Sequence, residues 1–307
     1  MKRVPLHLVA VLCVFVASSA SAQVARVFLA GTGNDAGDCT NQATPCRSLQ
    51  GAVTACPVDG EIIILDNGGY GGATITKSLT VNASAGVVAF IARTITVNIG
   101  ATATDKVVLR GLSMNGIVFG DYNGIAFNGG GTLVVENSVI AGFVNAINQF
   151  AAGSNLIVNN CEFRDGIRGV FTSTASDTNT NAIIENSRFE YTNYGVIVES
   201  GTANVSIRNS VMTNNGGAGV YATTSSGTRP VLIVVDTCTI AHNSKGTQAQ
   251  GYNGATATIR VTNSTIYHNV DGMFITGNSA AIESYGNNRV LANTNSSTFS
   301  GTVLALQ

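Results

Sequence analysis

One short pattern recurs through the middle of the chain, and it constrains the fold more than any other feature. The pattern is an apolar residue, any residue, Asn, Ser or Cys, any residue and a second apolar residue. Its Ser or Cys positions lie 23, 26, 23, 28 and 26 residues apart, so the chain is built from repeats of 23 to 28 residues. The copies are VENSVI (135–140), VNNCEF (158–163), IENSRF (184–189), IRNSVM (207–212), VDTCTI (235–240) and VTNSTI (261–266).

Each repeat holds three short β-like runs separated by turns, as in 182–184, 187–189 and 196–198. No segment between these runs has the periodicity or the length of a helix. Leucine-rich repeats need a different residue frame, and WD or kelch blades need longer repeats. The sequence therefore predicts an all-β solenoid, a right-handed parallel β-helix, whose neighbouring coils hydrogen-bond about 4.8 Å apart.

There is a physical reason for the Asn in the pattern. It lies at a sharp corner between two strands, where the backbone is left-handed, a conformation that Gly and Asn tolerate and β-branched residues do not. Thr237 replaces this Asn in one repeat, which predicts a distorted corner there. The next residue, Ser or Cys, is expected to face the packed interior. The structural corner residues are Asn137, Asn160, Asn186, Asn209 and Asn263.

The two ends of the chain differ from the repeats. Residues 1–22 are typical of a secretory signal peptide, with Lys2 and Arg3 before an apolar run and Ala20-Ser21-Ala22 as the cleavage site. We therefore expect a secreted or periplasmic protein that does not span a membrane. Residues 23–60 are expected to form a strand, a loop and a short capping helix over the open end of the β-helix. The β-helix is expected over 61–290 and a polar C-terminal cap over 291–307.

Five cysteines remain after residue 22, an odd number that leaves at least one thiol unpaired. Cys39 and Cys46 bracket a polar loop and are the best candidates for a disulfide. Cys56 is expected to be a buried thiol at the end of the short helix. Cys161 and Cys238 occupy the same repeat position three coils apart, about 14 Å, which is too far for a disulfide.

At this point the sequence resembles a known superfamily. The segment TPCRSLQGAVTACPVDGEIIILDNGGYGGATITKSLTVNA (44–83), followed by the repeats, is similar to the start of pectin-lyase-like β-helix proteins. The similarity is strongest to uncharacterised bacterial proteins with right-handed parallel β-helix repeats, and it covers essentially the whole chain after residue 22. The resemblance implies the fold. It does not imply one function, because the superfamily contains lyases, hydrolases, esterases, epimerases, adhesins and scaffolds.

The charged residues limit the chemistry that the chain can perform. Only 11% of its residues are charged, and 16 basic against 17 acidic residues leave no basic surface for nucleic acid. Pectate lyases resemble one another in a calcium site of several carboxylates, and hydrolases of this superfamily need paired carboxylates. A Gly followed by an apolar residue also recurs beyond each Asn corner, as at Gly195-Val196 and Gly272-Met273, and is called here the Gly corner. On the strand after the Gly corner, Glu199 is the only outward acid, so we predict no metal and no cofactor. If the protein is an enzyme, the acid/base candidates are Glu199, Arg168 and Lys245.

The charges themselves are expected to form ladders. Opposite charges that occupy one repeat position on neighbouring coils predict ion pairs across coils, which are typical of a solvated surface. The predicted pairs are Arg110 with Glu136, Glu162 with Arg188, and Arg208 with both Glu185 and Asp236.

The strand after the Gly corner also predicts an outward apolar stripe. An exposed apolar patch is typical of an interaction surface, and aromatic faces beside amides suit sugar rings. A register error of one residue would instead turn the stripe inward. The stripe holds Phe171, Ile197, Tyr221 and Phe274, with Gln248 among the amides.

A second set of ring side chains occupies one repeat position at a turn. His242 and His268 are 26 residues apart, and Tyr191 has the equivalent position in an earlier repeat. Catalytic zinc needs three protein ligands, and no third strong ligand joins the two histidines. These residues are therefore turn residues or glycan contacts.

The leading prediction is a secreted, non-catalytic β-helix protein that binds polysaccharide or a cell-surface glycan. The first alternative is a polysaccharide lyase or glycoside hydrolase of the pectin-lyase-like superfamily. The second is an extracellular scaffold that self-associates through the apolar stripe. The sequence leaves the ligand and the oligomeric state open.

Overall fold

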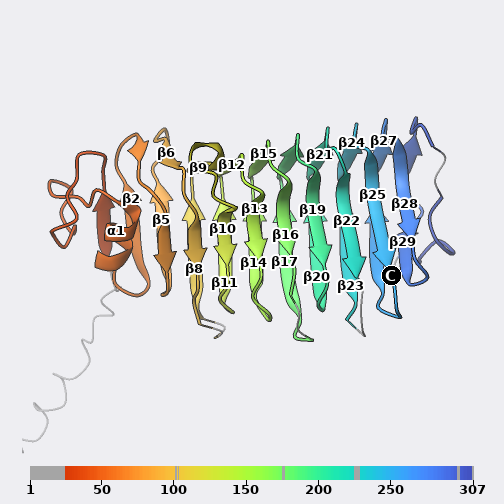
Figure 1. Cartoon of the computed structure of the whole chain (residues 1–307), viewed down its shortest axis with the longest axis horizontal. Helices are drawn as coiled ribbons and strands as arrows, with labels where there is room; N and C mark the ends of the chain where they lie inside the picture. Colours follow the sequence, from red (N-terminus) through yellow and green to blue (C-terminus); the bar gives the residue numbers. More distant parts are fainter. Residues whose placement is uncertain are drawn as a thin grey trace, which may run out of the picture.

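The computed structural model describes residues 25–305, except 101, 103, 175–176, 225–228 and 296–297. The predicted signal peptide therefore lies outside the described residues. Figure 1 shows the strands as a regular series along one long solenoid, with α1 (Leu49–Ala55) at its N-terminal end. The all-β parallel β-helix with a capping helix is confirmed. No described helix is long and apolar enough to cross a membrane.

Three parallel sheets run the length of the solenoid, and each coil contributes one strand to each sheet in turn. Sheet A has eleven described strands. They are β1 (Arg26–Leu29), β2 (Gly60–Ile64), β5 (Leu79–Ala83), β8 (Lys106–Arg110), β11 (Thr132–Glu136), β14 (Asn155–Asn159), β17 (Thr180–Glu185), β20 (Ala203–Arg208), β23 (Val231–Asp236), β26 (Ala257–Thr262) and β29 (Ala280–Ser284).

Sheet B follows sheet A in each coil, after the left-handed corner. Its strands are shorter, because the next turn begins after about three residues. They are β3 (Gly68–Gly69), β6 (Ala89–Ile91), β9 (Leu112–Asn115), β12 (Val139–Ala141), β15 (Glu162–Arg164), β18 (Arg188–Glu190), β21 (Val211–Thr213), β24 (Thr239–Ala241), β27 (Thr265–Tyr267) and β30 (Arg289–Leu291).

Sheet C completes the coil, and a 3-10 turn, η1 (Gly116–Val118), precedes one of its strands. Its members are β4 (Ala73–Ile75), β7 (Ile95–Val97), β10 (Asn123–Phe127), β13 (Asn145–Gln149), β16 (Arg168–Thr172), β19 (Tyr194–Glu199), β22 (Ala218–Thr224), β25 (Lys245–Gly251) and β28 (Asp271–Thr276).

The corner between sheets A and B has the left-handed backbone that the Asn pattern predicts. The five corner asparagines have φ values between 48° and 52°, and Gly111 has 75° at the same position of an earlier coil. The expectation for Thr237 was wrong. Its φ is 54°, so its corner is not distorted. The backbone N–H of Thr237 donates to Thr262 as that of Asn209 donates to Asp236, so the ladder of hydrogen bonds holds the β-branched residue in the common geometry.

The interior is filled by side chains stacked in columns along the axis. In sheet B, Phe163 lies directly against Phe189, with ring centroids 4.7 Å apart and planes at 8°. The Ser or Cys after each corner is buried, as the sequence predicts; Cys161 and Cys238 are separate free thiols in this column. Cys56 is also a buried free thiol.

A glycine recurs where sheet C begins, because the coils approach there too closely for a side chain. A Cβ on Gly169 would lie 2.5 Å from the carbonyl oxygen of Gly195, and a Cβ on Gly195 would lie 2.6 Å from that of Gly219. The Gly corner of the sequence pattern is therefore a requirement of coil-to-coil packing.

The turn between sheets B and C holds a buried asparagine ladder that the repeat pattern does not predict. The side chain of Asn243 donates to Oδ1 of Asn269 at 2.9 Å and accepts from the backbone and side-chain nitrogens of Asn215. The backbone and side-chain nitrogens of Asn269 in turn donate to Oδ1 of Asn293. The ladder satisfies polar groups that are buried inside the solenoid.

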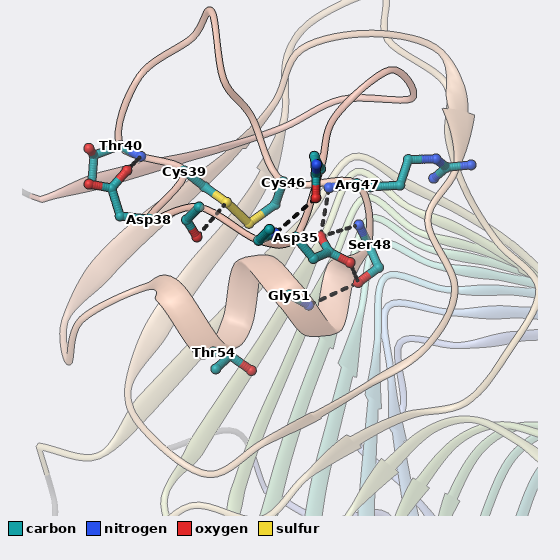
Figure 2. Close-up of a disulfide and its surroundings, with 12 residues drawn as sticks. Asp35, Asp38, Cys39, Thr40, Cys46, Arg47, Ser48, Gly51 and Thr54 are labelled. Carbon is teal, nitrogen blue, oxygen red and sulfur yellow. Dashed lines mark hydrogen bonds between the residues drawn. A yellow bond between two sulfur atoms is a disulfide. The ribbon is translucent and has the colours of Figure 1, made fainter.

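The N-terminal cap is fixed by side-chain hydrogen bonds and a disulfide, which Figure 2 shows. Cys39 and Cys46 form the disulfide that the sequence predicts. Ser48 caps α1 through the N–H of Gly51. Asp35 accepts hydrogen bonds from the N–H groups of Arg47 and Ser48 and from the Ser48 hydroxyl, which ties the polar loop to the start of the helix (Figure 2).

Half of the predicted charge ladder is present. Arg110 pairs with Glu136 at 2.8 Å, and Arg208 pairs with Asp236 at 3.3 Å, each across neighbouring coils. Glu185 forms no ion pair with Arg208 in the described part of the chain.

The prediction that Glu162 pairs with Arg188 was wrong. Each residue instead pairs within its own strand, Glu162 with Arg164 at 2.7 Å and Arg188 with Glu190 at 2.5 Å. Residues two apart point to the same face of a strand, so the nearest partner of a charge is often on the same strand.

Candidate functional site

The outward side of sheet C, called here the sheet C face, carries the predicted stripe. The paired positions of β13, β16, β19, β22, β25 and β28 place one residue of each strand in a single column. That column is Asn148, Phe171, Ile197, Tyr221, Gln248 and Phe274.

The stripe is less exposed than the sequence predicts. Ile197 is only 4% exposed, whereas Phe171, Tyr221 and Phe274 are half-buried. Stacked neighbours on both adjacent coils cover the sides of each residue, so only the outer surface of a ring remains open. The outward stripe is therefore a set of separate aromatic surfaces.

Cations cover two of these rings. The guanidinium carbon of Arg168 lies 4.5 Å from the centroid of Phe171, and the amine of Lys245 lies 5.0 Å from that of Phe274. Both contacts are within the range of a cation–π interaction. The sheet C face therefore combines positive charge with aromatic surface.

Two polar atoms on the middle strands of this sheet, β13 and β16, have no partner among the described residues. They are Nε of Arg168 and Oδ1 of Asn148, which are both buried. Asn148 pairs in register with Phe171, the ring under the Arg168 guanidinium, and the other end of that guanidinium donates to Oδ1 of Asn145 at 3.0 Å. Buried polar groups are almost always hydrogen-bonded in native proteins. These two atoms are therefore an unsatisfied donor and an unsatisfied acceptor on neighbouring strands.

Two tyrosines occupy the middle of the face. The rings of Tyr194 and Tyr221 lie 5.4 Å apart, and the Tyr221 hydroxyl donates to Oε1 of Gln250 at 2.5 Å. Burial raises the pKa of the Tyr221 phenol above its ordinary value of about 10, so this hydroxyl stays protonated at neutral pH.

The three acid/base candidates are not brought together. Arg168 and Lys245 share a column with Tyr194 and Ala218 between them, so they lie three coils, about 14 Å, apart. Glu199 lies at the far end of β19, five residues beyond Tyr194, or about 16 Å along the strand.

The structure does place one acid beside Lys245 that the sequence analysis did not select. Asp271 is its partner on the next coil, and Asp271 accepts a hydrogen bond from Asn295. Lys245 and Asp271 occupy the same position, the first residue of their strands, and this shared position was the signal in the sequence. Across residues 25–305, apart from the gaps given above, no group of three or more His, Cys, Asp or Glu side chains is placed to hold a metal ion.

The predicted glycan contacts at the turn form a separate group. Tyr191, His242 and His268 all have left-handed backbone and exposed side chains. The rings of His242 and His268 lie 5.2 Å apart, and that of Tyr267 at the end of sheet B lies 4.9 Å from His268. This group therefore adjoins sheet B and does not extend the aromatic column of sheet C.

An exposed apolar loop lies at the edge where sheet C begins. Ile117, Val118, Phe119 and Tyr122, between β9 and β10, are all exposed. Arg93 lies 5.0 Å from the centroid of Phe119. The repeat pattern does not predict this loop, because the loop interrupts a repeat.

The comparisons with known proteins agree on the architecture. The model of a family described as a right handed beta helix region matches residues 61–232. None of the curated proteins matches the sequence.

Two solved structures show how far the likeness extends. The crystal structure of pectate lyase Pel9A is 13% identical, with a TM-score of 0.55, over 90% of this chain and 82% of that one. The A-module of mannuronan C-5 epimerase AlgE4 from Azotobacter vinelandii is 13% identical, with a TM-score of 0.52, over 77% of this chain and 81% of that one. At this identity the likeness shows the fold alone.

Proposed function

Because this chain belongs to the right-handed β-helix family, we propose that it uses the sheet C face to bind an acidic polysaccharide and leaves that polymer intact. The observation that carries the proposal is the pair of cation–aromatic contacts on this face, Arg168 on Phe171 and Lys245 on Phe274. A uronate carboxylate would accept from the Arg168 guanidinium or the Lys245 amine, and the apolar face of a sugar ring would pack on an aromatic ring.

The arrangement along the solenoid supports an extended ligand. Arg168 and Lys245 lie in one register column, three coils or about 14 Å apart at the backbone, with Tyr194 and Ala218 between them. Phe171, Tyr221 and Gln248 lie along the neighbouring column. Aromatic rings suit the apolar faces of sugars, and the amide supplies hydrogen bonds to hydroxyls.

The proposal of binding without turnover rests on the separation of the acid/base candidates. General acid–base catalysis needs both groups within reach of one bond, about 5–10 Å apart for two carboxylates. By backbone register, Glu199, Arg168 and Lys245 are farther apart than that. We also propose that the protein acts outside the cytoplasm, a location that the predicted signal peptide supports and for which the Cys39–Cys46 disulfide is suited.

Calorimetric titration with oligogalacturonate, oligomannuronate and a neutral oligosaccharide tests the proposal. We expect binding of an acidic oligosaccharide that weakens with salt, and no binding of the neutral one. Arg168→Gln should weaken binding about tenfold or more, the effect of one charge-assisted hydrogen bond. Arg188→Gln on sheet B is the matched control and should bind normally. Equal affinities of Arg168→Gln and the unmodified protein would refute the site.

A further inference from the structure

The outer side of sheet A, called here the sheet A face, carries an apolar column. Register pairs place one residue from each of six successive strands, β8 to β23, in this column. Ile183 is 45% exposed, and the residues on either side are half-buried, so no described segment covers the middle of the column. Its members are Val108, Val134, Ile157, Ile183, Ser206 and Val234.

A column of charges runs beside it on the same six strands, two residues farther along each strand. It begins with the ion pair Arg110–Glu136 and ends with the ion pair Arg208–Asp236. Asn159 and Glu185 lie between these pairs. Each pair therefore has its cation on the N-terminal side, and the two pairs are equally distant from the middle of the column.

We propose that the sheet A face binds a second copy of this chain in a two-fold symmetric dimer, with the two solenoids antiparallel. A two-fold axis between the strands of Asn159 and Glu185 reverses the order of the charges. Arg110 then faces Asp236 of the second copy, Glu136 faces its Arg208, and Asn159 faces its Glu185. The Arg110–Glu136 pair of one copy and the Arg208–Asp236 pair of the other then form a ring of four alternating charges. The two-fold symmetry produces two such rings.

The same axis matches the apolar column. Ile157 faces Ile183 of the second copy at the centre, and Val134 faces Ser206. Ser206 is the small residue of the column, and a shallow groove of about 440 Å³ lies around it between Ile183 and Val234. Val134 of the second copy lies over this groove. The neutral amides of Asn155 and Asn181 border the other side of the column and meet across the axis.

The size of the face sets the expected affinity. Six strands of up to six residues cover about 24 by 20 Å, or roughly 500 Å² for each copy, which is small for a specific interface. We therefore expect a dissociation constant in the micromolar range. The sheet C face of each copy stays outside this interface, so dimer formation and glycan binding are tested separately.

Sedimentation velocity of the chain from residue 23, with two charge reversals, tests the dimer. In Arg208→Glu two acids face each other at both sites, and in Glu136→Arg two bases do, so each variant should be monomeric. An equal mixture of the two variants restores both attractive pairs and should form a heterodimer. Arg188→Glu, an exposed reversal on sheet B, is the control and should dimerise like the unmodified protein.

Three results would overturn the proposal. The first is an unmodified protein that stays monomeric at concentrations up to about 1 mM, where a micromolar dimer would be complete. The second is a dimer that both reversals leave intact, because its interface then lies elsewhere. The third is a mixture of the reversals that stays monomeric while both variants keep the far-UV circular dichroism of the folded protein.

Discussion

The buried asparagine ladder supplies the strongest test of how the coils are held together. Asn243 is 2% exposed, and its amide makes four hydrogen bonds. Its nitrogen donates to Oδ1 of Asn269 and to the Met212 carbonyl, and its oxygen accepts two bonds from Asn215. We predict that Asn243→Ala strongly destabilises the solenoid.

The magnitude follows from the group that loses its partner. The backbone N–H of Asn215 would be left buried and unpaired, whereas the side-chain nitrogen of Asn215 keeps its bond to the Phe189 carbonyl. An unsatisfied buried group costs about 1–3 kcal/mol, so we expect a loss of about 2 kcal/mol. That is a substantial part of the stability of an ordinary domain.

Guanidinium unfolding followed by far-UV circular dichroism measures this loss, because the chain has no tryptophan. Asn204→Ala, which removes an exposed asparagine from sheet A, is the control and should change the free energy of unfolding by less than about 0.5 kcal/mol. A loss below about 1 kcal/mol in Asn243→Ala would show that the ladder does not hold the coils as argued.

Three further predictions concern the corners, the thiols and the N-terminal cap. Asn209 has a φ of 48°, so Asn209→Val should cost about 1–2 kcal/mol in unfolding free energy while Asn209→Gly costs less than Val; equal costs would contradict a left-handed corner. Burial raises the pKa of the Cys161 and Cys238 thiols to about 11, so a disulfide reagent at pH 8 should modify them only after unfolding, and rapid reaction of the native protein would contradict this burial. Burial opposes ionisation of Asp35, but hydrogen bonds from Ser48 and the Arg47 backbone outweigh it and lower the pKa of this carboxyl. Its stabilising effect is therefore complete above the unfolded pKa of about 3.9 and is lost as the pH falls through the lower folded value, so hydrogen exchange of the α1 amides should accelerate below about pH 4 in the protein but not in Asp35→Asn.

The repeat pattern predicts the coil and its corners because both depend on local geometry. The spacing of the Ser or Cys positions sets which residues stack, and the structure places Phe171, Tyr221 and Phe274 in the predicted column. The left-handed corner is predictable because few residue types tolerate a positive φ. The Cys39–Cys46 disulfide is predictable for a similar reason, because its two cysteines are only seven residues apart in the sequence.

The features that the sequence did not predict depend on contacts between coils. Ile197 points outward yet is buried, because its neighbours on both coils cover it. Thr237 adopts the common corner because the ladder of hydrogen bonds on either side outweighs its own preference. Whether Asn243 is an exposed turn residue or a rung of a buried ladder depends on the direction of its side chain, which the residue type does not reveal.

The central claim is that the sheet C face binds an acidic oligosaccharide without catalysis. The most direct test is to recover the oligosaccharide after incubation with the protein. Protein at a concentration that saturates the ligand would be held with oligogalacturonate or oligomannuronate, with and without calcium. Unsaturated uronate absorbance, new reducing ends and uronate stereochemistry would then be read together. We predict that the ligand is bound and recovered unchanged. A product that forms with the protein and is lost in Lys245→Gln or Glu199→Gln, while Arg188→Gln still makes it, would contradict the account and place a catalytic site on this face.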